Sequence, residues 1–361
     1  MNSLILHFKK LDWMLIASAF LLTGIGLISI YSSSLGQGEL LNFKKQAIFF
    51  GVAVFLMFLL SFFDWRIFRE NSYLILVLYS LCLGALAGLF FFAPEIRGVK
   101  GWYKVGPVFI DPIEFTKIIL IILLAKYFSL RHIEMYRVRH ILLSGFYFLL
   151  PVSLIFFQPD LGSVLILAVL WLGALIISGI KLRHFLILVL CLLLIFSISW
   201  SFLLKDYQKE RIMSFIFPVD PLGMSWSQNQ AKIAIGSGGL WGQGIGQGSQ
   251  TQHGFLTEPQ TDFIFSAIAE EMGLLGVIFL FLLFSILIWR IIKIAIAGQS
   301  NFPRLFASGF AILLISQIFI HSGMNLGLLP IIGISLPLVS YGGSSLLATF
   351  AALGVLQNIK K

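Results

Sequence analysis

The side chains best placed for chemistry are charged residues at the start of a long apolar run. Asp111, Glu114 and Lys117 are spaced i, i+3 and i+6, so they share one face if the run is helical. Glu114 and Lys117 can be interpreted as a bridge that neutralises itself, or as the floor of a polar cavity that binds an anionic head group. We favour the cavity, because a charged pair in lipid costs more free energy than an apolar substitute.

Two aspartates stand before later apolar runs. Asp160 lies in the turn 158–162, and Asp262 lies in the segment 258–263. Each can be interpreted as the N-cap of the following helix, or as a carboxylate at the boundary where water meets a lipid head group. Glu270 and Glu271 follow Asp262 in the same run and would lie about 12–14 Å deeper at ~1.5 Å per residue. They need partners or water there, and the sequence does not name them.

Several kinds of function are excluded. The Gly-rich stretch 236–248 contains neither a GxxxxGKS/T nor a GxGxxG nucleotide-binding motif, and we interpret it as a flexible linker or a mobile flap over an outer cavity. The six histidines show no metal-ligand spacing. The net charge of +9 is not gathered into a basic cluster with interleaved aromatic residues, so we expect no nucleic-acid partner.

Membrane-spanning helices must position these side chains. Hydrophobic residues make up 58% of the 361 residues and charged residues only 11%, so lipid must be the solvent for most of the chain. Ten apolar runs approach the ~20 residues that a spanning helix needs. We predict an all-α integral membrane protein of about ten transmembrane helices, with residues 1–361 forming a single polytopic domain. The runs are 11–31, 46–63, 73–93, 112–130, 141–158, 162–180, 184–204, 263–289, 304–326 and 336–356.

The distribution of basic residues predicts the orientation. With a cytoplasmic N-terminus, the cytoplasmic segments hold 15 of the 25 Lys and Arg residues and only four acids. Both termini are then cytoplasmic. Residues 205–262 form a long extracytoplasmic loop between the seventh and eighth helices, and 94–111 form a second outer segment.

The end of the chain suggests two further surfaces. Residues 330–345 combine helix breakers, small residues and hydroxyls at membrane depth, which points to a backbone that lines the same outer cavity. Ser308, Gly309 and Ala311 offer a small-residue face on the ninth helix, and we expect a partner's membrane helix to pack against it.

Six motifs in order resemble one family over essentially the whole chain. They are QPDLG at 158–162, DYQKER at 206–211, DPLG at 220–223, KIAIGSGGLWGQG at 232–244, TDFIFSAIAEEMG at 261–273 and LPLVSYGGSS at 336–345. This pattern is similar to the SEDS (shape, elongation, division and sporulation) proteins, and residues 206–208 and 248–250 resemble the branch that acts in cell elongation.

The resemblance implies a peptidoglycan glycosyltransferase that polymerises lipid II on the outer face of the bacterial cytoplasmic (inner) membrane. Asp262 matches the family's essential aspartate and would be the general base of an inverting transfer. The expected substrate-binding residues are Glu114, Lys117, Asp160, Lys100, Lys45 and Ser344, with Mg²⁺ or another divalent cation as a further positive charge beside the diphosphate. Gly101, Ile113 and Gln260 depart from the family pattern. Gln260 stands where the resemblance implies a histidine, so a histidine two residues before the aspartate is not essential here.

The expected partners are lipid II, a class B penicillin-binding protein and other membrane proteins of the elongation complex. No Ser-x-x-Lys acylation motif occurs on the outer segments, so cross-linking must come from another protein. A lipid II flippase is the alternative function. It needs the same cavity and charges, but no base and a path to the cytoplasmic face.

Overall fold

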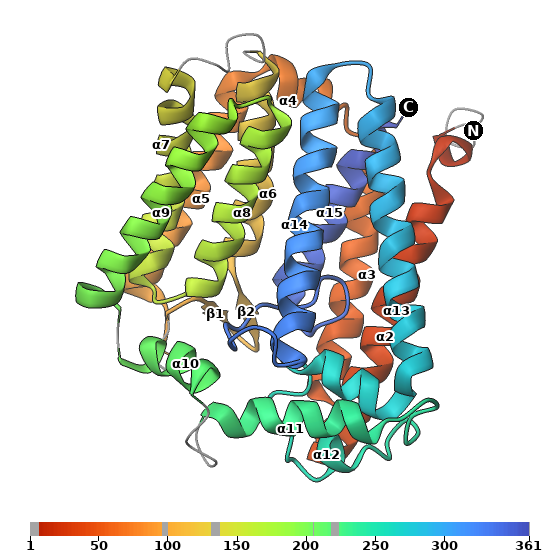
Figure 1. The fold of residues 1–361 in the computed structure, drawn as a ribbon. Helices are drawn as coiled ribbons and strands as arrows, with labels where there is room; N and C mark the ends of the chain where they lie inside the picture. Colours follow the sequence, from red (N-terminus) through yellow and green to blue (C-terminus); the bar gives the residue numbers. More distant parts are fainter. Residues whose placement is uncertain (1–6, 96–99, 131–137, 205, 218–223, 361) are drawn as a thin grey trace.

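The computed structural model describes residues 7–95, 100–130, 138–204, 206–217 and 224–360. The long helices are α2 (Trp13–Gln37), α3 (Leu41–Phe62), α5 (Ser72–Phe92), α6 (Pro112–Ser129), α7 (Val138–Phe157), α8 (Leu161–Ile177), α9 (Leu182–Phe202), α13 (Ile264–Ala297), α14 (Asn301–Asn325) and α15 (Gly343–Ile359). The short elements are α4 (Arg66–Glu70), α10 (Asp206–Ile216), α11 (Met224–Ser237), α12 (Ser249–Gln252), β1 (Tyr103–Val105) and β2 (Val108–Ile110). Figure 1 shows the long helices side by side, with both termini at one end and α10, α11 and α12 at the other.

Each of the ten predicted apolar runs coincides with a long helix, so the all-helical membrane fold is confirmed. Within the described ranges, seven helices are long and apolar enough to cross a membrane. Of the remaining three, α8 and α15 are apolar but only 17 residues long, and α6 carries Glu114, Lys117 and Lys126. The chain is a multi-pass membrane protein.

The two outer segments contain more regular structure than we expected. Residues 94–111 include an antiparallel hairpin in which Val105 pairs with Val108 across a two-residue turn. Gly106 has a φ of 60°, as the first central residue of such a turn requires. The Tyr103 hydroxyl donates to the Ala85 carbonyl at 2.6 Å and attaches the hairpin to α5. Residues 205–262 include α10, α11 and α12, so that segment is largely helical among its described residues.

The Gly-rich stretch 236–248 is attached to α13, which is broken near its start. Gly273 has a φ of 64° and a ψ of −167°, so the helix changes course there. The backbone amides of Gln243 and Gly244 donate to the carbonyls of Glu270 and Glu271 at 2.9 and 3.0 Å. These bonds satisfy backbone groups next to the break. Our interpretation of the stretch as a flexible linker or a mobile flap was therefore wrong.

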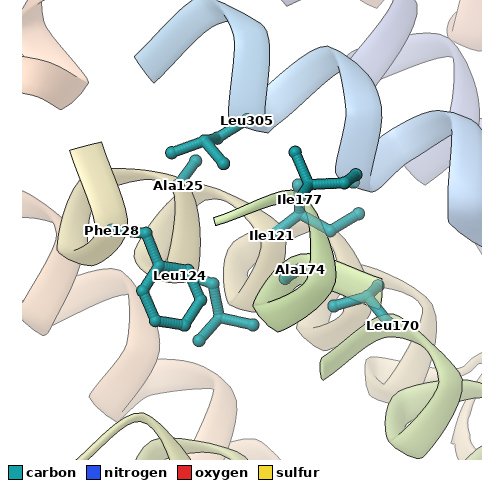
Figure 2. Close-up of a pocket in the computed structure, with 9 residues that line it drawn as sticks. Ile121, Leu124, Ala125, Phe128, Leu170, Ala174, Ile177 and Leu305 are labelled. Carbon is teal, nitrogen blue, oxygen red and sulfur yellow. The ribbon is translucent and has the colours of Figure 1, made fainter. Parts of the chain in front are cut away.

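The small-residue face of α14 lies inside the bundle. A Cβ added at Gly309 would lie 3.0 Å from Cγ2 of Ile121 on α6, and Ala311 is buried as well. A void of about 10 Å³ lies beside this contact. Figure 2 shows the side chains that line it, among them Leu124 on α6 and Ala174 on α8. Our prediction that this face packs against a partner was wrong, because α6 already covers it.

The end of the bundle that holds the termini is joined by a buried ion pair. Asp12 caps α2 and is 2% exposed, and its carboxylate accepts hydrogen bonds from Arg290 on α13. The Lys360 ammonium lies 3.2 Å from the same carboxylate. The Gln357 side chain bonds to both the amide and the carbonyl of Asp12. One aspartate therefore connects α2, α13 and α15.

Candidate active site

Asp262 stands in the tight turn that leads into α13. The helix begins at Ile264 and its N-cap is Phe263, so Asp262 does not occupy the N-cap position that we considered as an alternative. The side chain of Asp262 is half-buried. A Cβ added at Gly333 would lie 3.9 Å from its Oδ2, so the carboxylate lies beside the irregular segment between α14 and α15. Gly333 has a φ of 71°, which favours glycine and keeps this space open.

The turn before Asp262 is held by its neighbours. The Ser340 hydroxyl donates to the Thr261 carbonyl at 2.9 Å, and the Tyr341 amide donates to the Gln260 carbonyl at 2.8 Å. The Gln260 side chain accepts from Asn42 at 2.8 Å and donates to Ser34 at 3.2 Å. Gln260 is therefore part of the scaffold of the turn.

Glu114 and Lys117 form the ion pair that their spacing predicts. Lys117 Nζ lies 2.8 Å from Glu114 Oε1, and the two side chains are 4% and 14% exposed. Asp111 caps α6 by accepting from the Ile113 amide, and Pro112 occupies the first turn, where its missing N–H leaves no bond unmade. The three charged side chains therefore lie at the start of α6.

Asp160 caps α8, as its position in the sequence predicts. Its carboxylate accepts from the amide of Ser163 at 3.0 Å and from the hydroxyl at 2.6 Å. Asp160, Glu114 and Lys117 all lie close enough to Asp111 to act on its carboxylate electrostatically. The capping role and the placement beside the charged start of α6 therefore occur together.

The segment 330–345, which we expected to line an outer cavity, contacts both the Asp160 turn and the start of α6. A Cβ added at Gly162 would lie 2.6 Å from the carbonyl oxygen of Ile332, so the Asp160 turn packs directly against the segment. Its other end reaches α6, where the Ser344 hydroxyl accepts from the Asp111 amide at 2.9 Å. Gly333 and Ser340 lie between these points and face the Asp262 turn. The middle of the segment therefore lies beside the Asp262 turn, and its two ends contact the Asp160 turn and the start of α6.

The remaining lysines named from the sequence occupy the same end of the molecule. Lys45 is half-buried on α3, next to Gln46, whose side chain bonds to the Ser340 carbonyl and the Gly342 amide at 3.3 and 3.2 Å. Lys100 is half-buried just before the hairpin. Residues 97–99 of that outer segment lie outside the described residues. Among the described residues, neither lysine forms an ion pair with Asp111, Glu114 or Asp160.

Glu270 and Glu271 have partners in the outer segment. The Glu270 carboxylate accepts from the amides of Gln250 and Thr251 at 2.6 and 3.0 Å, and from the Thr251 hydroxyl at 2.7 Å. Glu271 accepts from Ser32, close to the end of α2. Both acids lie in the first turns of α13, before its break at Gly273, and the partners that the sequence did not name are the residues of α12 and α2.

A long apolar groove lies on the membrane side of the site. It has a volume of about 430 Å³ between α13 and α14 and continues into the turn after α14. Phe319 and Leu328 are 70% and 69% exposed at its rim, and Gly323 lies in its wall. The groove ends under α11, since the side chain of Lys232 covers the backbone at Gly327.

The sequence analysis did not identify two buried amide side chains that hold the site. Gln46 and Asn325 are buried amides within apolar helices, and both bind backbone atoms around the Asp262 turn. The sequence feature that could have identified them is an amide side chain within a membrane-spanning run, because such a side chain must find hydrogen-bond partners inside the protein. In the described part of the chain, no three His, Cys, Asp or Glu side chains come together as a metal site.

Comparison with known proteins gives one consistent result. The sequence model of the FTSW_RODA_SPOVE cell cycle proteins matches residues 12–361. The chain is 37% identical to the peptidoglycan glycosyltransferase MrdB of Escherichia coli K12, over 78% of this chain and 76% of that protein. It is 35% identical to the stage V sporulation protein E of Bacillus subtilis, over 97% of each chain.

Two solved structures share the fold. One belongs to work described as "Structural coordination of polymerization and crosslinking by a peptidoglycan synthase complex", with a TM-score of 0.82 and 32% identity over 97% of both chains. The other is the rod shape determining protein RodA of Thermus thermophilus, with a TM-score of 0.72 and 30% identity over 97% of this chain and 96% of that one. With its family match over nearly the full length, the chain belongs to the SEDS family, which includes FtsW, RodA and SpoVE.

Proposed function

We propose that this protein is a peptidoglycan glycosyltransferase that polymerises lipid II into glycan strands on the outer face of the bacterial cytoplasmic membrane during elongation. The observation that carries the proposal is the placement of Asp262. Its half-buried carboxylate stands just before α13, beside a segment that leads to the buried Glu114–Lys117 pair. The start of α13 is bonded to α12, which lies at the end of the bundle opposite the termini in Figure 1. The excess of basic residues on the side of the termini supports the proposal that the opposite end is the outer one.

The reaction needs a base and a stabilised leaving group. An acceptor sugar hydroxyl attacks the anomeric carbon of the donor, a new C–O bond forms, and the bond to undecaprenyl diphosphate breaks. An α-linked donor and a β-linked product require inversion, so one carboxylate takes the acceptor proton on the face opposite the leaving group. Asp262 takes that proton, and Lys117 stabilises the negative charge of the departing diphosphate.

The charge balance supports a divalent cation as a further component. Among the described residues, the cluster at the start of α6 combines the acidic side chains of Asp111, Glu114 and Asp160 with the ammonium of Lys117, which is already paired with Glu114. A diphosphate brought to this cluster adds more negative charge. Mg²⁺ is commonly bound by one or two carboxylates together with substrate phosphates, and Asp160 with Asp111 would supply them. Lys45 and Lys100 are secondary cationic contacts in this proposal, and Ser344 holds the cap of α6.

Cross-linking requires a second protein, and we propose a class B penicillin-binding protein whose membrane helix packs into the groove between α13 and α14. The groove replaces the buried Gly309 face as the docking surface, since it is apolar and its rim residues Phe319 and Leu328 are exposed. Its end under α11 places the partner's outer domain beside the segment 205–262.

A detergent assay tests the proposed activity against the flippase alternative. The purified protein is incubated with lipid II in detergent, with and without a divalent cation, and the products are separated by size. A polymerase makes glycan strands with no membrane to cross, whereas a flippase leaves lipid II unchanged. Unchanged lipid II in every condition, including with the cross-linking partner present, would contradict the proposal.

A further inference from the structure

Two buried side chains in the last two turns of α14 bind backbone carbonyls of Asp262 and of the segment beside its carboxylate. Asn325 is fully buried, and its Nδ2 donates to the carbonyl oxygen of Asp262 at 2.9 Å. His321 lies one turn earlier on the same face, also fully buried, and its Nδ1 bonds to the carbonyl oxygen of Ile334 at 2.7 Å. Ile334 follows Gly333, the residue that faces the Asp262 carboxylate.

The hydrogen bonds of Asn325 use all of its amide. Nδ2 also donates to the His321 carbonyl at 2.8 Å, and Oδ1 accepts from the amide and the hydroxyl of Ser266 at 3.3 and 2.6 Å. A carboxamide is the side chain that offers two donors and two acceptors in one plane. Neither leucine nor aspartate of the same size can make this set. The side chain therefore ties the start of α13 to the end of α14.

The hydrogen bonds of Asn325 and His321 fix the geometry of the Asp262 side chain and involve no contact with a substrate. The carbonyl of Asp262 is attached to the same Cα as the carboxylate, so fixing that carbonyl fixes the direction of the Cα–Cβ bond. The acceptor of the His321 bond is a carbonyl, so Nδ1 carries the proton and the imidazole acts as a donor. That bond fixes the backbone next to Gly333, the residue that faces the carboxylate. A displacement of about 1 Å in a reacting group can lower a rate about 100-fold.

We infer that Asn325 and His321 are positioning residues that clamp Asp262 against Gly333 for proton transfer. The inference rests on the proposed function for its catalytic consequence, and on the observed contacts for its geometry. It assigns a role to two buried polar side chains that the proposed reaction does not itself use.

The test compares two bridging asparagines, the buried Asn325 and the half-buried Asn358. Asn325→Ala removes the clamp, whereas Asn358→Ala removes an asparagine that bridges α15 to the Ser61 carbonyl and the Trp65 amide at the opposite end. We expect kcat for lipid II polymerisation to fall about 10- to 100-fold in Asn325→Ala with KM little changed. In Asn358→Ala we expect a lower melting temperature with unchanged kcat. His321→Ala should resemble Asn325→Ala.

Amide hydrogen exchange of residues 258–266 gives a second readout that does not depend on activity. Exchange there should be faster in Asn325→Ala and unchanged in Asn358→Ala. If Asn325→Ala does not fold, Asn325→Asp keeps the bonds from Ser266 and removes the donor to Asp262. Normal kcat and normal exchange in a folded Asn325 variant would overturn the clamp. A wild-type protein that makes no glycan overturns the proposed function, and the exchange measurement then still decides whether the clamp exists.

Discussion

Lys117 Nζ lies 2.8 Å from Glu114 Oε1, and both side chains are almost fully enclosed by the bundle. We expect Lys117→Ala to lower the melting temperature in detergent, because it leaves the Glu114 carboxylate unpaired at a cost of about 3–5 kcal/mol. The double variant Glu114→Gln/Lys117→Met should fold better than Lys117→Ala. Polymerisation should be lost in both, because both lack the ammonium that stabilises the diphosphate.

Lys126 on the same helix provides the matched control. It lies near the other end of α6, where its ammonium bonds to the Arg69 carbonyl. Lys126→Ala should keep its polymerase activity. Full activity in the double variant would reduce the Glu114–Lys117 pair to a structural role.

The Glu270 carboxylate organises the segment 249–251. Both of its oxygens accept hydrogen bonds, so Glu270→Gln places an NH₂ group against existing donors. Each buried bond that is lost should cost about 1–3 kcal/mol. We expect a lower melting temperature and faster proteolysis between residues 243 and 252. The exposed Glu39, at the same end of the molecule, serves as control, and equal sensitivity of Glu39→Gln and Glu270→Gln would refute the assigned role.

The sequence predicted the helices and the charged residues better than the course of the chain between them. Apolar runs and caps such as Asp160 are local signals, and the structure has them where expected. The break at Gly273 is not local, because its strained backbone is stabilised by bonds to residues 239–244. The prediction of a partner helix at Gly309 was wrong for a related reason. A small residue allows close packing of a helix of the same protein as well as of a partner's helix, and the local sequence does not distinguish the two.

Asp12 contributes stability that depends on pH. Burial alone would raise the pKa of its carboxyl, but hydrogen bonds from Arg290, Leu15 and Lys360 outweigh burial and hold the pKa below its ordinary value of 3.8. The stabilisation is therefore complete above that value and is lost as the pH falls below it. We expect Asp12→Asn to lose about 3 kcal/mol at neutral pH. The difference from the wild-type melting temperature should shrink in strong acid.

The exposed Arg69–Glu70 pair is the comparison for Asp12. Its side chains are 41% and 66% exposed, so Glu70→Gln should cost less than about 1 kcal/mol. An Asp12→Asn variant as stable as Glu70→Gln would show that the buried pair does not fasten α2 to α13.

The groove between α13 and α14 makes the partner proposal testable. Ile315 lies in its wall and is 45% exposed, so Ile315→Trp should fill the groove without disturbing the interior. We expect co-purification with a class B penicillin-binding protein to fall about 10-fold, since a loss of ~1.4 kcal/mol has that effect. Leu190→Trp on the exposed face of α9 is the control. If Ile315→Trp still binds the partner and Leu190→Trp does not, the interface lies on α9 and not in the groove between α13 and α14.

The most direct test of the account replaces the proposed base. Asp262→Asn keeps the size of the side chain and removes its ability to take a proton, while Glu258→Gln makes the same change on an exposed acid four residues earlier. Both variants are purified in detergent and incubated with lipid II, and glycan strands are measured as polymer formed per protein. We expect Glu258→Gln to polymerise normally and Asp262→Asn to make no detectable glycan while keeping its melting temperature. Near-normal glycan synthesis by a folded Asp262→Asn protein would contradict the account, because the proton would then have gone elsewhere.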